Sequence, residues 1–403
     1  MTIINSSLWL PFVLIIATLT ACSEEHQSSS VPVTQNHGHQ ANADAPAPAD
    51  GGGGIQNSVV LDLKRTPGLD EMIPKLLSKQ LISVGETHTN YGHHLNQLEI
   101  IRRIYNEFPD IAIGMEMFQQ PYQSQLDAFI KGDLSERQLL EESGWYKRWG
   151  YDYRLYRPVL DFAQKNHIPV VALNISTEMK ERVSEVGLDG LGEEERQQLP
   201  AEIDRSDQVY EQRLREIFDQ HPQMKKEDFE RFVDVQLLWD ESMASQAAAW
   251  LQAHPGKKMI LLAGTGHLIF GSGIPDRVTR RTPVESAIVL PADGLEVTRE
   301  ISDFVIYPPK AALPGAGLMG LFLEDADNGV KISGLGSDSN AAKAGVKQDD
   351  VIQMLNGKKI VTLGDIKIEL LDKPPGEEVS LGVSRKGMLW GDEMQEFTFE
   401  LGQ

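Results

Sequence analysis

The sequence predicts an α/β domain with a mostly parallel sheet flanked by helices, followed by a small β-rich domain. Two observations support this division. Between Val59 and Tyr307, short apolar runs alternate with longer amphipathic stretches, which is typical of parallel strands joined by helices. After Tyr307 the segment PPKAALPGAG interrupts the pattern, and a different kind of sequence follows. We therefore expect one domain over residues 58–309 and a second over residues 313–403.

The expected elements of the first domain alternate along the chain. Strands are predicted at residues 81–84, 111–115, 170–173, 259–263, 286–290 and 304–307. Helices are predicted at residues 95–107, 122–131, 154–166, 206–218 and 226–253. The last helix carries apolar residues at helical spacing, which we interpret as core.

Composition limits the classes of function. A chain of 403 residues is too long for one typical core. Its 38 basic and 59 acidic residues give a net charge of -21, which argues against duplex nucleic acid as a partner because phosphates attract surplus positive charge. The one cysteine, Cys22, excludes a disulfide framework and a thiolate zinc cluster. Any metal chemistry must therefore use histidine, tyrosine or carboxylate.

The N-terminus predicts membrane attachment through a lipid. The run LWLPFVLIIATLTAC has the length of a signal peptide, and its ending resembles a bacterial lipobox, although residues 1–7 contain no Lys or Arg. Residues 1–22 would then be a lipoprotein signal peptide, with Cys22 lipidated by acyl chains such as palmitate. Ser23 after the cysteine suggests the outer membrane, facing the periplasm. Residues 23–57, rich in Ser, Ala, Pro and Gly, predict a disordered tether.

Polar residues stand at the ends of four predicted strands. Glu86 and His88 follow the first strand, Glu116 ends the second, Asn174 ends the third, and His267 follows the fourth. The carboxyl ends of parallel strands meet at one edge of a sheet, so we expect these side chains to converge there. Such a set could bind a metal, orient a histidine or act as a general base. The neighbouring glycines would let the backbone approach a ligand closely: Gly85, Gly264 and Gly266.

An aromatic and basic cluster, GWYKRWGYDYRLYRP at residues 144–158, forms a second candidate site. Aromatic faces beside cations in an otherwise acidic chain suit a flat, anionic ligand such as haem. Both candidate sites also have a structural interpretation. Glu86 and His88 could cap the helix near His93, Glu116 could pair with Arg102 or Arg103, and the aromatic cluster could be ordinary packing.

The segments ISVGETHTNYGHHLNQ, IAIGMEMFQQPYQSQLDAFIKGDLSE, GWYKRWGYDYRLYRPVLDFA, IPVVALNIS and LLAGTGHL together resemble the ChaN family of haem-binding lipoproteins. The resemblance covers residues 77–290 and implies a lipoprotein of bacterial haem-iron uptake. It implies ferric haem bound at the interface of a homodimer, held by a tyrosine phenolate with histidine assisting. An outer-membrane haem receptor would be a partner. The candidate haem-binding residues are Tyr91, Tyr151, Tyr153, His88 and His93.

The second domain resembles a bacterial PDZ domain over nearly its whole length. Ala341 to Val346 matches the start of the family's helix, DDVI its strand, and Asn356-Gly357 its hairpin turn. The segment of Gly320, Leu321 and Phe322 occupies the position of the carboxylate-binding loop, although it departs from the usual Gly-Leu-Gly form. The resemblance implies capture of a peptide C-terminus, or of a β-strand at an open sheet edge.

Two further functions remain open. The ChaN family is similar to Tiki-type proteins and erythromycin esterases, so His88, Glu116 and His267 could bind a divalent metal or activate water, which would make the protein a hydrolase or protease. Gln119 stands where the Tiki pattern has tyrosine, which disfavours a protease. Alternatively, the protein could be an envelope adaptor that acts mainly through its PDZ domain. A haem-binding protein without enzymatic activity is the favoured interpretation.

Overall fold

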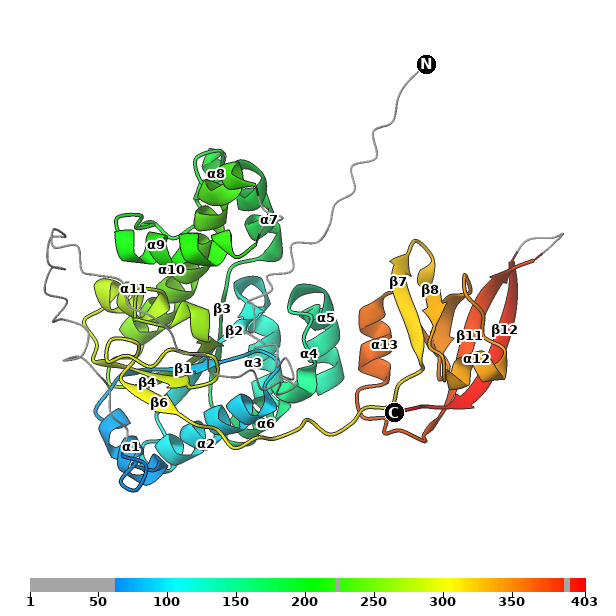
Figure 1. The fold of residues 1–403 in the computed structure, drawn as a ribbon, viewed down its shortest axis with the longest axis horizontal. Helices are drawn as coiled ribbons and strands as arrows, with labels where there is room; N and C mark the ends of the chain where they lie inside the picture. The colour runs from blue at the N-terminus through cyan, green and yellow to red at the C-terminus, as the bar shows by residue number, and fades with distance from the viewer. Residues whose placement is uncertain (1–61, 222–224, 388–391) are drawn as a thin grey trace, which may run out of the picture.

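The computed structural model of the chain describes residues 62–221, 225–387 and 392–403. The predicted signal peptide, Cys22 and the predicted tether over residues 23–57 lie outside the described residues. Two separate sheets, each with its own hydrophobic core, make up the described part. Figure 1 shows the larger sheet with its helices and, beside α4 and α5, the smaller β-rich unit.

The first sheet has six parallel strands in the order β3-β2-β4-β1-β5-β6. The chain runs outward from β1 through β2 to β3, returns through β4 and continues to β5 and β6 on the other side of β1. In such a sheet, loops at the carboxyl ends of strands near the change of direction are the usual ligand-binding region. The strands are β1 (Leu81–Glu86), β2 (Ile111–Gln119), β3 (Val170–Asn174), β4 (Lys258–Gly264), β5 (Ser286–Pro291) and β6 (Phe304–Ile306).

Helices cover both faces of this sheet, because its central strands are apolar on both faces. Ile82 and Val84 of β1 belong to the core on one face, while Leu81 belongs to the core on the other. The first face is covered by α1 (Leu69–Leu76), α2 (Tyr91–Glu107), α3 (Gln123–Lys131), α4 (Glu136–Glu142), α5 (Trp145–Arg148) and α6 (Arg157–Lys165). The second face is covered by α10 (Phe229–Ala253) and α11 (Ile274–Arg281).

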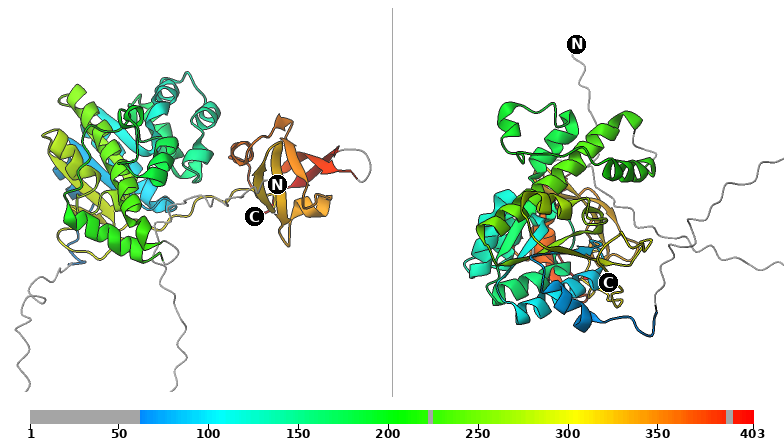
Figure 2. Two further views of the ribbon diagram at one scale, coloured as in Figure 1. Left: turned by 90° about the horizontal axis from the view of Figure 1, so that it is seen from above. Right: turned by 90° about the vertical axis from the view of Figure 1, so that its left-hand side faces the viewer.

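Three shorter helices extend away from the sheet beside the N-terminal half of α10, as Figures 1 and 2 show, and the first and third of them pack against it. They are α7 (Thr177–Val186), α8 (Glu193–Arg196) and α9 (Gln208–Asp219). Single 3-10 turns connect several elements: η1 (Gln120–Tyr122), η2 (Tyr153–Leu155), η3 (Lys226–Asp228) and η4 (Thr265–His267).

The second sheet is antiparallel, with the order β12-β11-β9-β8-β7 and the short β10 paired with β9. Strand β7 ends this order, and its residue Phe322 is 64% exposed. The elements are β7 (Leu321–Ala326), β8 (Gly329–Leu335), α12 (Asn340–Ala344), β9 (Val351–Leu355), β10 (Lys358–Lys359), α13 (Leu363–Glu369), β11 (Glu378–Lys386) and β12 (Asp392–Glu400).

The predicted fold class is confirmed: a parallel sheet flanked by helices is followed by an antiparallel β-rich unit. The predicted helix boundaries differ from the observed ones by one to four residues, and two of the differences have a clear local cause. The helix expected at residues 95–107 begins at Tyr91, because the Asn90 side chain accepts a hydrogen bond from Gly92 N and caps it there. The helix expected at residues 154–166 begins at Arg157, because residues 153–155 form a 3-10 turn instead. In the described ranges, every helix is too short or too polar to cross a membrane.

Candidate functional site

The carboxyl ends of β1, β2 and β4 bring two glutamates together. Glu86, the last residue of β1, lies in register with Gly264, the last residue of β4. Glu116 lies within the neighbouring β2, and its Oε2 accepts a 2.7 Å hydrogen bond from Gly264 N. Both glutamates are buried. The predicted convergence of polar residues at this edge is therefore present in the structure.

Glu86 orients His88. The Nδ1–H of His88 donates to Glu86 Oε1 at 2.5 Å, and the second carboxylate oxygen of Glu86 has no hydrogen-bond partner among the described residues. Burial alone would lower the pKa of His88, but the Glu86 carboxylate, with a smaller contribution from Glu116, raises it. The side chain of His88 is 11% exposed, whereas that of Glu86 is fully buried. The free Nε2 of this oriented imidazole is thus the reactive atom at the edge.

His267 is a buried cation held between two carboxylates. Its Nδ1–H donates to Asp240 Oδ1 at 2.6 Å, and its Nε2 lies 3.4 Å from Glu116 Oε1. Burial alone would lower the pKa of His267, but Glu116 and Asp240 raise it to about 10. Burial would raise the pKa of Glu116, yet His267 and His88 lower it to about 2. His267 is therefore an imidazolium at neutral pH, and both of its nitrogens face acids.

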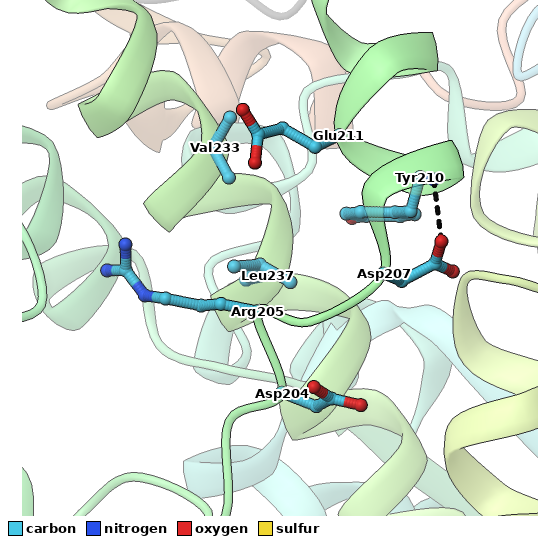
Figure 3. A pocket seen from close by; sticks show the side chains of 7 residues that line it. All are labelled: Asp204, Arg205, Asp207, Tyr210, Glu211, Val233 and Leu237. Atoms are coloured by element: carbon cyan, nitrogen blue, oxygen red, sulfur yellow. Dashed lines mark hydrogen bonds between the residues drawn. The ribbon is translucent and has the colours of Figure 1, made fainter.

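The same network continues outward from the sheet to a small cavity. Tyr210 donates its hydroxyl hydrogen to Asp240 Oδ2 at 2.6 Å. Tyr210 also lines a cavity of about 110 Å³ over α9 and α10, shown in Figure 3, where its backbone N–H donates to Asp207. Acidic side chains dominate the cavity wall, so it does not suit an anionic ligand such as haem. The remaining lining residues are Asp204, Arg205, Glu211, Val233 and Leu237.

Aromatic side chains of the segment over residues 144–158 surround His88. The rings of Trp149 and Tyr151 each lie 4.8 Å from the His88 ring, centre to centre. Tyr156 packs edge-on against His94 at 4.5 Å, and its hydroxyl donates to the His88 carbonyl at 3.4 Å. The segment therefore belongs to the same site as the strand-end acids, which the sequence left as two separate candidates.

Tyr151 is the candidate haem-binding tyrosine that lies against His88. It is half-buried, and burial raises the pKa of its phenol. Tyr153 is fully buried beside Trp145, its hydroxyl has no hydrogen-bond partner in the described part of the chain, and burial raises its pKa strongly. Tyr91 begins α2 and packs partly against the core. Only His88 and Tyr151, among the five candidates, are shown in mutual contact.

His93 has a structural role in this conformation. Its Nδ1 accepts a 2.9 Å hydrogen bond from Thr87 N, and its Nε2–H therefore donates to Asp293 Oδ2 at 3.1 Å. Burial lowers the pKa of His93, so its neutral form is favoured. With both nitrogens engaged, His93 fixes the loop between β1 and α2 and leaves no donor atom for a ligand.

Two glycines are required for the close packing of this edge. A Cβ on Gly264 would lie 3.0 Å from His88 Cε1, and a Cβ on Gly85 would lie 2.7 Å from Leu290 Cδ2. Both distances are tighter than ordinary contact, so these glycines allow close packing against protein side chains, while the predicted close approach to a ligand stays a prediction. Gly320, before β7, has φ of +71°, and a Cβ there would meet Ser339 at 2.9 Å.

The alternative roles considered for the motif residues, helix capping by Glu86 or His88 and an ion pair between Glu116 and an arginine, are not found in the part of the chain that the structure describes. Asn90, not Glu86 or His88, caps α2. Arg103 pairs with Glu99 and Asp70, while Glu116 faces His267. Asn174 donates to the Glu116 carbonyl at 3.1 Å and so joins β3 to the same edge.

Sequence reasoning missed three functional-site residues, namely Asp240, Tyr210 and His94. His94 lies between Gln97 and the His88 carbonyl. The signal for Asp240 was an acid within an otherwise apolar stretch of α10, since an acid is buried only where it has a partner. Nothing in the sequence pattern singles out Tyr210. In the described residues, no three His, Cys, Asp or Glu side chains are grouped so that they could hold a metal ion.

The fold and site together define an α/β protein whose histidine and aromatic side chains gather at the carboxyl edge of a parallel sheet. The sequence profile of the family described as haem-binding uptake, Tiki superfamily, ChaN, matches residues 72–278, just over half of the chain. The chain belongs to this ChaN haem-binding family. The profile of the PDZ domain matches residues 317–399. We refer to the second unit below as the PDZ domain.

Solved structures resemble part of the chain. A structure of ChaN from Campylobacter jejuni, described as showing cofacial haem binding, is 21% identical and covers 59% of this chain and 91% of that one, with a TM-score of 0.49. An erythromycin esterase mutant in its open conformation is 12% identical and covers 55% and 72%, with a TM-score of 0.35.

Curated relatives match in a short part of the chain. The periplasmic serine endoprotease DegP of Salmonella typhimurium is 41% identical over 63 residues, which is 16% of this chain and 13% of that protein. The periplasmic pH-dependent serine endoprotease DegQ of Escherichia coli is 30% identical over 128 residues, or 32% and 26%. The chain thus spans about a quarter or less of the length of these two relatives.

Proposed function

We propose that this protein is a lipid-anchored haem-binding protein of bacterial haem-iron uptake, and that it takes ferric haem at the edge formed by His88 and Tyr151. The observation that carries the proposal is the oriented imidazole of His88, flanked by Trp149 and Tyr151. Membership of a haem-binding family supports it.

The residues at this edge fit haem chemically. Glu86 holds the Nδ1–H of His88, which leaves Nε2 as a nitrogen donor, and such carboxylate-histidine pairs are typical of metal-ligating imidazoles. Trp149 and Tyr151 offer aromatic faces on which a flat macrocycle packs. Arg148 and Arg154 bring positive charge to the same segment, and in the structure Arg148 pairs with Glu178 and Arg154 with Asp152. Bound haem would supply a ferric iron that accepts a phenolate oxygen.

Tyr151 is the best candidate for that phenolate. It contacts His88 and is partly exposed, whereas the Tyr153 hydroxyl is enclosed by protein. Since burial raises the pKa of Tyr151, the free phenol stays protonated at neutral pH and must lose its proton when it binds a metal. The proposed haem binding therefore releases a proton and should weaken as the pH falls.

The proposal extends to cellular location and assembly. The lipobox resemblance at Cys22 supports attachment to the outer membrane on its periplasmic side. Two copies of the chain would share the haem, and an outer-membrane receptor would deliver it, as the resemblance to the ChaN family implies. Metabolic labelling with a tritiated fatty acid, compared between wild type and Cys22→Ser, tests the anchor. Label in the wild type alone supports it, and equal label in both contradicts it.

The PDZ domain supports a peptide or protein partner at β7, the end strand of its sheet. Gly320 turns the chain with positive φ immediately before this strand, and Leu321 and Phe322 begin it. Such an edge accepts an extended peptide by strand addition. We propose that the PDZ domain binds the C-terminal residues of an envelope protein at this edge.

A second candidate function is hydrolysis, with His88 as the general base. The specific observation is again the Glu86–His88 pair, since a carboxylate that orients an imidazole also increases its ability to accept a proton from water. His267 would not be a metal ligand in this function, because both of its nitrogens face carboxylates.

The proposal is tested by titrating the purified protein with ferric haem and following the Soret band. Wild type should give a saturable shift, and His88→Ala should weaken the binding. His254→Ala is the matched control, since His254 stacks on Trp250 and contacts neither motif. If free-haem spectra persist at micromolar wild-type protein, the haem function is wrong, and the hydrolase becomes the first candidate.

A further inference from the structure

Helix α13 of the PDZ domain contacts two parts of the protein at once. On one side it lies against β7, where Leu363 N donates to Asp325 Oδ1 at 2.7 Å, and Ile366 is buried in the PDZ core. On the other side it contacts α4 and α5 of the first domain, which we call the haem-binding domain below. Figure 1 shows α13 between β7 and these two helices.

The contact with the haem-binding domain buries apolar side chains. Ile368 of α13 and Leu371 just beyond it are 8% and 9% exposed, and both belong to the core cluster of the first domain rather than to the PDZ core. An apolar side chain at an incidental contact would remain largely hydrated. Burial of two such residues in the core of the other domain indicates a specific interface.

Charged contacts surround this apolar centre. Arg157 donates to Asp372 at 2.5 Å and also to Glu136 of its own domain. Arg137 of α4 donates to Glu369 at 2.9 Å. These pairs are partly exposed and contribute little energy individually, but they fix the orientation of the two domains.

The linker between the domains is also held. Arg154 donates to the Pro314 carbonyl at 3.0 Å, and Leu313 packs against the core of the first domain. The Pro309 carbonyl lies so close to Gly92 that a Cβ there would approach it to 2.6 Å. The linker and α13 thus contact the haem-binding domain at separate points.

The part of the first domain that α13 contacts is the back of the aromatic segment. Lys367 lies 5.1 Å from the centre of the Tyr146 ring, and a Cβ on Gly364 would lie 3.5 Å from Tyr146 Cβ. Tyr146 lies in α5, which Trp149 follows directly. The front of the segment carries Trp149 and Tyr151 against His88.

From this arrangement we infer that α13 is a positioning element of the haem site: docked against α5, it holds Trp149 and Tyr151 in contact with His88. This inference rests on the proposed haem site for its functional meaning, but the positioning itself does not require haem. The PDZ domain therefore contributes to the geometry of the haem site as well as to partner binding, and separation of α13 from α5 loosens the aromatic side of that site.

A cross-link tests the docking. The distance of 3.5 Å between the two Cβ positions at residues 364 and 146 falls at the short end of the disulfide range of about 3.5–4.5 Å. The full chain carrying Tyr146→Cys and Gly364→Cys should form this disulfide under mild oxidation, seen by mass spectrometry of the tryptic peptides. Absence of the cross-link in folded protein overturns the inference.

A wedge tests the positioning. Gly364→Trp places a large side chain between α13 and α5 without entering the PDZ core, and Lys343→Trp, at an exposed position of α12, is the matched control. The wedge should shift the imidazole NMR resonances of His88 in the haem-free protein, because the ring currents of Trp149 and Tyr151 change. It should also raise the haem Kd by about tenfold, a coupling typical of linked sites.

The outcomes separate the two proposals. If wild type fails to bind haem but the wedge shifts the His88 resonances, the proposed function is wrong and the positioning inference stands. If Gly364→Trp leaves both the His88 resonances and the haem Kd at the values of Lys343→Trp, the inference is overturned while haem binding stands. Should the Gly364→Trp variant be unfolded, the smaller wedge Gly364→Leu supplies the same two readouts, and the inference is overturned if both stay at the wild-type values.

Discussion

Replacing His267 by glutamine should remove a large part of the pH dependence of stability. In the native protein His267 is a cation between Glu116 and Asp240, with its pKa raised from 6.5 to about 10. His267→Gln keeps the size of the side chain approximately but removes the charge. Two buried carboxylates then face each other without a cation, which typically costs about 3–5 kcal/mol.

The magnitude follows from linkage between protonation and folding. A rise in pKa from 6.5 to about 10 corresponds to about 5 kcal/mol, at about 1.4 kcal/mol for each tenfold change. Because the folded pKa lies above the unfolded one, this stabilisation is complete below pH 6.5 and is lost as the pH rises through 10. Glu116 acts in the opposite range: its pKa is lowered to about 2, so its contribution is present above pH 4.5 and is lost as the pH falls through 2.

Urea unfolding at several pH values between 6 and 9 measures this contribution. Tryptophan fluorescence reports mainly on the first domain, because this domain holds four of the six tryptophans: Trp239, which lies edge-on to His267 at 6.0 Å, and Trp145, Trp149 and Trp250. Wild type should lose up to about 1.4 kcal/mol more than His267→Gln for each pH unit above 7. Equal slopes for the two proteins would refute the buried-cation description.

Three other predictions address the site and its surroundings. Gly264→Ala should weaken haem binding with little loss of stability, because its Cβ would displace the His88 ring; Soret titration and thermal unfolding check this, and unchanged affinity contradicts it. Glu86→Gln should lower the pKa of His88 measured by NMR, since the largest favourable charge is removed; an unchanged midpoint would contradict the pairing. His93→Ala should cost about 1–3 kcal/mol in urea unfolding, because Thr87 N loses its acceptor, while the Soret spectrum is kept; loss of the spectrum at full stability would make His93 a ligand.

All six strands of the first sheet could be predicted from the sequence, because β1 to β5 are buried almost throughout and therefore form continuous apolar runs, and the half-buried β6 is also apolar. Their ends could not. Glu86 and Glu116 were expected to follow or end strands, but β1 includes Glu86 and β2 continues past Glu116 to Gln119. A charged residue interrupts the apolar pattern, so the predicted strand ends there. Its burial within the strand depends on partners such as His88 and His267, which the local pattern does not reveal.

The meeting of separate segments at the site could be predicted only in part. Strand ends of a parallel sheet converge by topology, so Glu86, Glu116 and His267 were correctly brought together. The approach of Trp149 and Tyr151 to His88 depends on how α5 and the following turn pack, and no sequence periodicity encodes that. The docking of α13 against α5 depends on an interface between domains, so it could not be predicted from the hydrophobic periodicity either.

The most direct test of the proposed haem site is a visible-spectrum titration with ferric haem of three variants side by side, Tyr151→Phe, Tyr91→Phe and Tyr153→Phe. We predict that wild type, Tyr91→Phe and Tyr153→Phe give the same saturable Soret shift, and that Tyr151→Phe loses the tyrosinate-ligated spectrum. A Tyr151→Phe protein with the wild-type spectrum and affinity would contradict the assignment of the haem site to the edge at His88 and Tyr151.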